Sequence, residues 1–116
     1  MSSAVLLSAT NITIANAASA TVTGHTSNGY RVASTASYSG KTVTGEGQVL
    51  SGPPCSISVN ANGYYHIGVL LCFSCNAQGS EGYSTYCSAN ITGNDTLDYA
   101  ENTATFNSTY SLYVHT

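Results

Sequence analysis

Four cysteines are the residues whose type and spacing most directly suggest chemistry: Cys55, Cys72, Cys75 and Cys87. Cys72 and Cys75 form a C-x-x-C pair, a spacing that redox centres and zinc sites both use. A redox pair normally opens a helix in an α/β fold, and a zinc site needs a second close pair of ligands. Neither context surrounds this pair, because Cys55 and Cys87 stand alone and His66 is isolated. We therefore predict structural disulfides, with no metal and no cofactor.

Hairpin symmetry predicts how the cysteines pair. Cys75 and Cys87 flank residues 79–82 almost symmetrically, so a hairpin turning there would place them opposite each other. Cys55 and Cys72 flank a second turn sequence in a similar way, although their parity requires a bulge. Among the three possible connectivities of four cysteines, the spacing favours Cys55–Cys72 together with Cys75–Cys87.

Tyrosines are the best candidates for binding. The chain has nine Tyr, two Phe and no Trp. A Tyr ring can stack on a sugar face while its hydroxyl bonds to sugar hydroxyls. The predicted binding residues are Tyr64, Tyr65, Tyr83 and Tyr86, which lie next to turn sequences, and the neighbouring Asn62. Tyr is also an ordinary strand residue, so packing in a sheet is the alternative role for each ring.

Asp95, Asp98 and Glu101 form the only acidic cluster in the sequence. Their oxygens could hold Ca²⁺, but the spacing lacks the pattern and the turn glycine of an EF-hand loop. They could also form a glycosidase pair, but 116 residues leave little room for a substrate cleft. No hydrolase, zinc-protease, dinucleotide or phosphate-loop motif is present. We therefore predict a solvated acidic turn and no enzymatic activity.

Four N-glycosylation sequons begin at Asn11, Asn90, Asn94 and Asn107. Some arise by chance in a chain this rich in Asn, Ser and Thr. Together with the even number of clustered cysteines, they favour a secreted, extracellular glycoprotein. Residues 1–7 lack a positive n-region and a long apolar core, so they are not an intact signal peptide. We expect a mature secreted protein with an added start Met.

The composition limits the possible partners. Only 6% of the residues are charged, against roughly 25% in a typical soluble domain. The formal net charge of −3 leaves no basic stripe to neutralise phosphates, so we expect neither nucleic acid nor an anionic membrane as partner. The longest dense apolar stretch, residues 67–73, is too short for a membrane span. Neutral polar side chains suit contact with hydroxyl-rich surfaces, and equally the permanent contacts of a fibre subunit.

The elements that must position these residues are short strands. β-Branched and aromatic residues recur in runs separated by Gly, Asn and Ser, and no stretch keeps a helical apolar stripe for three turns. One or two helical turns are expected from Asn94. The expected strands are residues 5–14, 20–24, 30–38, 41–50, 56–60, 64–73, 83–88 and 105–115. The expected turns are residues 27–29, 39–40, 52–54, 60–63, 79–82 and 93–95.

About eight strands at this spacing predict a small antiparallel β-sandwich or barrel, tied by disulfides. We expect a single β domain over residues 1–116, because this length suits one core. Residues 64–73 are apolar on both faces, which predicts a central core strand covered on both sides.

Three functions agree with these features. The first is a secreted, non-catalytic, lectin-like protein whose Tyr, Asn, Ser and Thr side chains bind a neutral glycan or cell-surface glycoconjugate. The second is a self-assembling subunit of an extracellular fibre, coat or adhesive layer, a homo-oligomer in which residues 5–14 or 105–115 are exchanged as added strands. The third is a small secreted toxin or inhibitor, because disulfide-tied domains often have that use.

Overall fold

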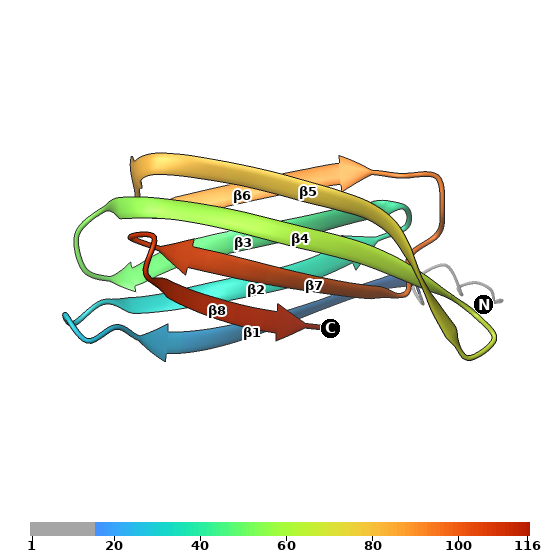
Figure 1. Cartoon of the computed structure of the whole chain (residues 1–116), viewed down its shortest axis with the longest axis horizontal. Coiled ribbons are helices and arrows are strands. Elements are labelled where there is room, and N and C mark those ends of the chain that lie inside the picture. Colours follow the sequence, from blue (N-terminus) through green and yellow to red (C-terminus); the bar gives the residue numbers. More distant parts are fainter. Residues whose placement is uncertain (1–15) are drawn as a thin grey trace, which may run out of the picture.

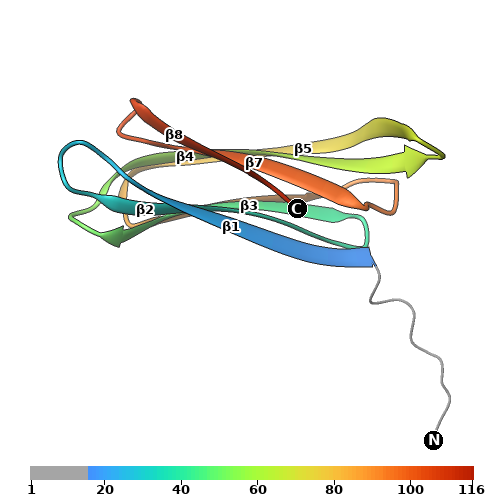
Figure 2. The ribbon, with the colours of Figure 1, turned by 90° about the horizontal axis from the view of Figure 1, so that it is seen from below.

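The chain folds into two β-sheets that lie face to face. The computed structural model describes residues 16–116, and all strand pairings in this part are antiparallel. Sheet A has the strand order β1-β2-β3-β6, and sheet B, which faces the viewer in Figure 1, has the order β5-β4-β7-β8. Figure 2 shows the two layers edge-on. The strands are β1 (Ala17–His25), β2 (Arg31–Ser39), β3 (Thr42–Ser51), β4 (Cys55–Ile67), β5 (Leu70–Ser84), β6 (Tyr86–Thr92), β7 (Tyr99–Phe106) and β8 (Tyr110–His115). The predicted all-β class with about eight antiparallel strands is confirmed.

Alternating side chains build the core between the sheets. In β7 every second residue is buried and the residues between them are partly buried, and β2 follows a similar alternation. A period of two is what a strand with one covered face requires. The core has one cluster that includes Val43 and Leu97 and another that includes Ile57 and Phe106. Ala89 packs against both clusters and joins them.

Small residues let the sheets approach closely at the centre. A Cβ atom added at Gly45 would clash with Asn102 Oδ1 and would lie 2.7 Å from the Cβ of Ala61. Asn102 is fully buried, and its amide nitrogen donates to Ser34 Oγ at 2.9 Å and to the Glu46 carbonyl at 3.1 Å. Two hydrogen bonds from Asn102 therefore join the sheets next to Gly45, where there is no room for a side chain.

Two of the expected turns are wrong. Residues 60–63 lie inside β4 and residues 79–82 lie inside β5, so these two long strands form one hairpin that turns at Gly68. Gly68 has a φ of 62°, which glycine adopts without strain. Residues 60–63 have the composition of a turn, but their burial alternates as in a strand. Ala61 and Gly63 are buried, and Asn60 and Asn62 are not. The expected turns that do connect strands are residues 27–29, 39–40, 52–54 and 93–95.

The expected strand over residues 105–115 is two strands. β7 ends at Phe106 and β8 begins at Tyr110. Between them Asn107 and Ser108 have positive φ values of 53° and 58°. This left-handed backbone reverses the chain, a feature that the apolar alternation on either side does not reveal.

The region around Asn94 also differs from expectation. No helical turn forms there, since residues 93–98 are an irregular loop. The loop is held by the side chain of Leu97, which is fully buried against the core. The strand expected over residues 5–14 lies outside the described residues.

The core strand expected over residues 64–73 is wrong. Its first half ends β4 and its second half begins β5, and the pairing of β4 with β7 stops at Tyr64. Beyond this point the two strands of the hairpin pair with each other, so Ile67 is 63% exposed and Val69 is fully exposed. At the right of Figure 1 this end of the hairpin reaches past the other strands.

The predicted cysteine pairings are wrong as well, and no disulfide joins any two of the four cysteines in the structure. Cys55 lies opposite Ser84, whereas Cys72 lies opposite Tyr65 at the other end of the β4–β5 ladder, roughly 30 Å away at 3.3 Å per residue. The predicted hairpin that would join Cys75 to Cys87 does not form, because β5 and β6 belong to different sheets.

Cys75 and Cys87 also lie at different positions along the length of the sandwich. A Cβ atom added at Gly93 would lie 3.2 Å from the Cβ of Cys75, so Cys75 is level with the end of β6. Cys87 lies five residues before that end of the strand, about 17 Å away in extended chain.

Candidate functional site

The outer face of sheet B brings together polar and aromatic side chains from all four of its strands. The strand registers place Asn62 opposite Glu101, Tyr64 opposite Tyr99, and Glu101 opposite His115. Tyr113 lies two residues from His115 on the same side of β8, as the period of a strand requires. We use the name Glu101 face for the following residues: Asn62, Tyr64, Phe73, Tyr99, Glu101, Tyr113 and His115.

Glu101 is the hub of this face. Its Oε2 atom accepts a hydrogen bond from the Tyr64 hydroxyl at 2.6 Å and another from Asn62 Nδ2 at 3.1 Å. Its Oε1 atom accepts from the Tyr113 hydroxyl at 2.7 Å. Three strands are therefore tied to one carboxylate. Since a carboxylate has about four acceptor positions, one remains for a ligand.

Aromatic rings surround the hub in a continuous row. Tyr64 lies edge-on to Phe73 with ring centroids 6.0 Å apart, and 5.6 Å from Tyr99. His115 lies 5.6 Å from Tyr99 and 6.1 Å from Tyr113. These separations are typical of favourable aromatic pairs, so the row is a stable, preformed surface.

The hydrogen bonds also set the charges on the face. Burial alone would raise the pKa of the Glu101 carboxyl, but its three hydrogen bonds outweigh burial and lower that pKa. The hydrogen bond to Glu101, together with burial, raises the pKa of Tyr64 to about 12. The same causes raise the pKa of Tyr113 well above its usual range. At neutral pH the Glu101 carboxyl is therefore ionised, and the Tyr64 and Tyr113 hydroxyls that donate to it are protonated.

Amide side chains extend the face along β4 and β5. Asn76 Nδ2 donates to Asn60 Oδ1 at 2.6 Å and to Asn62 Oδ1 at 2.7 Å. Gln78 Nε2 donates in turn to Asn76 Oδ1 at 2.9 Å. Each amide in this ladder fixes the orientation of the next, so the donors and acceptors left free are held in set directions.

The predicted binding residues are divided by the structure. Tyr64 and Asn62 belong to the Glu101 face. Tyr65 has the opposite parity on β4, and its pKa is raised mainly by nearby Asp95. Tyr83 is 77% exposed near the far end of β5, and Tyr86 lies in sheet A, where its hydroxyl donates to Glu46 at 2.7 Å.

Sequence reasoning missed Glu101 as the hub, and it missed Phe73, Tyr99, Tyr113 and His115. Glu101 was assigned to an acidic turn, yet it lies within β7. The pairs Tyr99 with Glu101 and Tyr113 with His115 share a spacing of two, which marks one face of a strand. That spacing is the signal that could have revealed them.

The three described sequon asparagines, Asn90, Asn94 and Asn107, are all exposed. Their side chains are accessible to a glycosyl transfer enzyme, and Asn107 lies in a turn, the usual setting of such sites. Asn11 lies outside the described residues.

Within residues 16–116, no group of three or more His, Cys, Asp and Glu side chains is arranged to hold a metal ion. His66 Nδ1 lies 2.7 Å from Asp98 Oδ1, and both side chains are partly exposed. In the same part of the chain no helix is long and apolar enough to cross a membrane.

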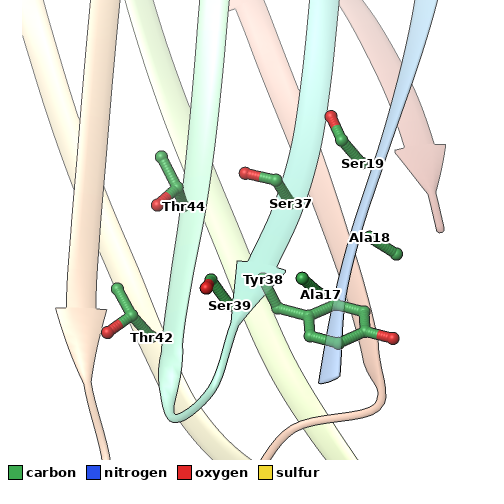
Figure 3. A pocket seen from close by; sticks show the side chains of 8 residues that line it. All are labelled: Ala17, Ala18, Ser19, Ser37, Tyr38, Ser39, Thr42 and Thr44. Carbon is green, nitrogen blue, oxygen red and sulfur yellow. The ribbon is translucent and has the colours of Figure 1, made fainter. Parts of the chain in front are cut away.

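A hollow of about 480 Å³ lies on sheet A, near the turn at Gly40 (Figure 3). Its lining includes Ala17, Ser19, Ser37, Ser39, Thr42 and Thr44. Tyr38, which also borders it, is buried. The hollow therefore offers hydroxyl and methyl groups, but neither an exposed ring nor a carboxylate, and it is a weaker candidate than the Glu101 face.

No protein-family model matches this chain, and no curated protein or solved structure matches it either. The chemistry of the described residues is therefore the basis for any functional assignment.

Proposed function

We propose that this protein is a secreted, non-catalytic, lectin-like protein that binds a neutral saccharide on the Glu101 face. The observation that carries the proposal is the Glu101 carboxylate, held by three hydrogen bonds beside a row of aromatic rings on a solvent-facing sheet. Rings can stack on the apolar face of a sugar, and the carboxylate and amides can accept and donate hydrogen bonds to its hydroxyls.

The polar groups of the face are already oriented, which lowers the entropic cost of binding. Tyr113 is about half exposed, so part of its ring is open to a ligand while its hydroxyl remains bound to Glu101. A single carboxylate hub without an attacking nucleophile supports binding rather than bond cleavage, because sugar hydrolysis generally uses two carboxyl groups.

A panel of uncharged oligosaccharides, followed by calorimetry on those that bind, tests this proposal. Tyr113→Ala should weaken binding by about tenfold or more, because it removes both a ring surface and a hydrogen bond to the hub. Tyr83→Ala is the matched control, since Tyr83 is exposed but lies off the face. Absence of binding across the panel, or equal losses in both variants, would overturn the proposal.

Secretion and glycosylation are part of the same proposal. The exposure of Asn90, Asn94 and Asn107 supports it. Expression in a secreting eukaryotic host should yield a protein whose mass falls on treatment with a peptide N-glycosidase. An unchanged mass, with all three sites unmodified in peptide mapping, would count against a secreted glycoprotein.

Cross-linking in an oxidising compartment also belongs to the proposal. Cys55 and Cys87 are buried in the same apolar cluster between the sheets, so they are the two cysteines most suited to a link across the sandwich. Cys75 belongs to the other cluster. Peptide mapping of the non-reduced protein should therefore recover Cys55 joined to Cys87, and recovery of Cys55 joined to Cys72 would contradict the registers described above.

A second candidate function is a subunit of a fibre or coat. It is supported by the edge strands β1, β6, β5 and β8, which have a free edge within residues 16–116 and could accept an exchanged strand. Light scattering after size exclusion separates the two candidates. Large ordered assemblies without sugar would favour the subunit, and a small species that binds sugar would favour the lectin-like protein.

A further inference from the structure

The turn of the β4–β5 hairpin carries an exposed group of apolar side chains. Ile67 is 63% exposed, Val69 is fully exposed, and Leu70 is 62% exposed. Leu71 and Phe73 follow, each also exposed. We use the name hairpin tip for these five residues: Ile67, Val69, Leu70, Leu71 and Phe73. Contiguous apolar surface of this kind generally marks a site of contact with a protein or a membrane.

The hairpin tip is a well-formed element that stands clear of the core. The last pairs of the ladder are Tyr65 with Cys72, then residue 66 with 71, then Ile67 with Leu70. These three pairs extend about 10 Å beyond Tyr64, the last residue of β4 that pairs with β7. Figure 1 shows this end of the hairpin projecting past the neighbouring strands.

Backbone groups at the base of the tip are already paired. The Asp98 N–H donates to the Tyr64 carbonyl at 2.9 Å, and the Asp98 carboxylate accepts from the His66 N–H at 3.0 Å. The His66 ring nitrogen Nδ1 also lies 2.7 Å from Oδ1 of the same carboxylate, at hydrogen-bonding distance. The backbone at the base of the tip therefore needs no water to satisfy these groups. Deep burial would still be costly, because the strand edges beyond Tyr64 are open.

The side chains are layered by polarity along the hairpin axis. Residues 67–75 contain no charged residue. Only apolar residues and Gly68 form the apex, from Ile67 to Leu70. At the next levels His66 lies opposite Leu71 and Tyr65 lies opposite Cys72. Phe73 lies opposite Tyr64, where the polar outer face of sheet B begins. This order of an apolar tip, an aromatic and polar collar, and a polar body is the order of environments across a membrane–water interface.

The area of the tip fits a lipid surface better than a second copy of the chain. Five such side chains, mostly about half exposed, present roughly 500 Å² in total, whereas a stable dimer buries about 800 Å² on each partner. The nearby loops carry Asp95 and Asp98 against Lys41 alone, so their charge does not favour an anionic surface.

We propose that the hairpin tip inserts into the outer part of an uncharged, zwitterionic lipid bilayer. The insertion is shallow, roughly 5–10 Å, because that depth contains the turn with Val69 and the Ile67–Leu70 pair, and it leaves the hydrogen-bonded His66 and Asp98 at the headgroup level. The sandwich then stands on the membrane with its long direction away from the surface. The Glu101 face is exposed at its side, except for Phe73, which both surfaces share at the base of the tip. This proposal does not depend on sugar binding.

Flotation with vesicles of pure phosphatidylcholine tests the proposal. The intact protein should float with the vesicles, and the partition coefficient should not rise when anionic lipid is added. The variant Val69→Ser/Leu70→Ser should partition at least about tenfold less, since burial of one aliphatic side chain of this size is worth that factor or more. The matched control is Leu50→Ser/Ile91→Ser, which removes two exposed apolar side chains away from the tip and should float like the intact protein.

A Val69→Trp variant supplies a second, independent measurement. Residue 69 is fully exposed in the turn, so the ring does not disturb packing. Its emission should shift to shorter wavelength with phosphatidylcholine vesicles and be quenched best by lipids brominated near the headgroup. No flotation, flotation that needs anionic lipid, or equal loss in the control variant would overturn the proposal. So would self-association in the absence of vesicles that is lost in Val69→Ser/Leu70→Ser, because it would assign the tip to protein contact.

Discussion

Strand β4 passes through two different environments. At its centre Ile57 is 1% exposed and Ala61 is fully buried, because β3 of sheet A lies directly over them. At its end Ile67 is 63% exposed, although the sequence around it is more apolar than the sequence around Ile57. Two isoleucines on one strand thus differ in burial: Ile57 lies in the core and Ile67 lies at the surface. The presence of an opposing sheet decides burial here, and local hydrophobicity does not.

The largest expected change in stability comes from shortening a buried side chain in the part of β4 that sheet A covers. Ile57→Ala should lower the free energy of unfolding by about 2–4 kcal/mol, because it removes buried methyl groups and leaves a cavity between two close sheets. Urea denaturation with an unchanged m-value measures this loss. A loss below about 1 kcal/mol would mean that the centre collapses around the cavity and is less tightly packed than the structure shows.

A smaller effect should follow from overfilling the same centre. Gly45→Ala should destabilise the fold by about 1–3 kcal/mol, because the new methyl group meets Asn102 and Ala61. Gly82→Ala is the matched control, since a Cβ atom there has nothing within 4 Å. Thermal unfolding of both variants gives the comparison. Equal midpoints would contradict the close approach of the sheets.

The stability provided by Glu101 should be lost in acid. Glu101 pairs with Asn62, close to the point where β4 leaves the other strands. Because the pKa of Glu101 is lowered in the folded protein, its carboxylate stabilises the fold above the unfolded pKa of about 4.3, and this contribution disappears as pH falls through the folded value. Glu101→Gln should therefore unfold with less dependence on pH below about 4.3. At neutral pH the loss should stay below about 1 kcal/mol, because the carboxylate is partly exposed.

Unfolding curves from pH 2.5 to 7 in parallel measure this difference. Identical acid dependence in the two proteins would show that the three hydrogen bonds to Glu101 do not stabilise its charged form.

The smallest effect is expected at the bare end. Ile67→Ala should change the free energy of unfolding by no more than about 0.5 kcal/mol, because little of its surface is buried. Compared with Ile57→Ala under the same conditions, it isolates the contribution of the opposing sheet. A loss as large as that of Ile57→Ala would mean that the tip is covered in solution, for example by another copy of the chain.

Particular residues show how far sequence reasoning reached. The alternation of Phe106, Tyr110 and Leu112 predicted one strand over residues 105–115, which is two strands separated by a turn. The turn at Ser39 and Gly40 was placed correctly because it depends on adjacent residues. The turns inside β4 and β5 were misplaced, since Asn and Gly are turn residues by composition but can also alternate along a strand. Tyr64 and Asn62 were identified, but without their partner Glu101.

By itself the sequence determined an all-β chain with few charges, because a period of two and the scarcity of ionisable residues are local properties. Tertiary structure alone decided three things: that Tyr64 meets Glu101, 37 residues away, that Cys55 and Cys72 are far apart, and that residues 67–73 are bare. Each depends on which strands pair and where their ladder stops. That choice is made by contacts between distant segments, such as the close packing of Gly45 against Asn102, which joins one sheet to the other.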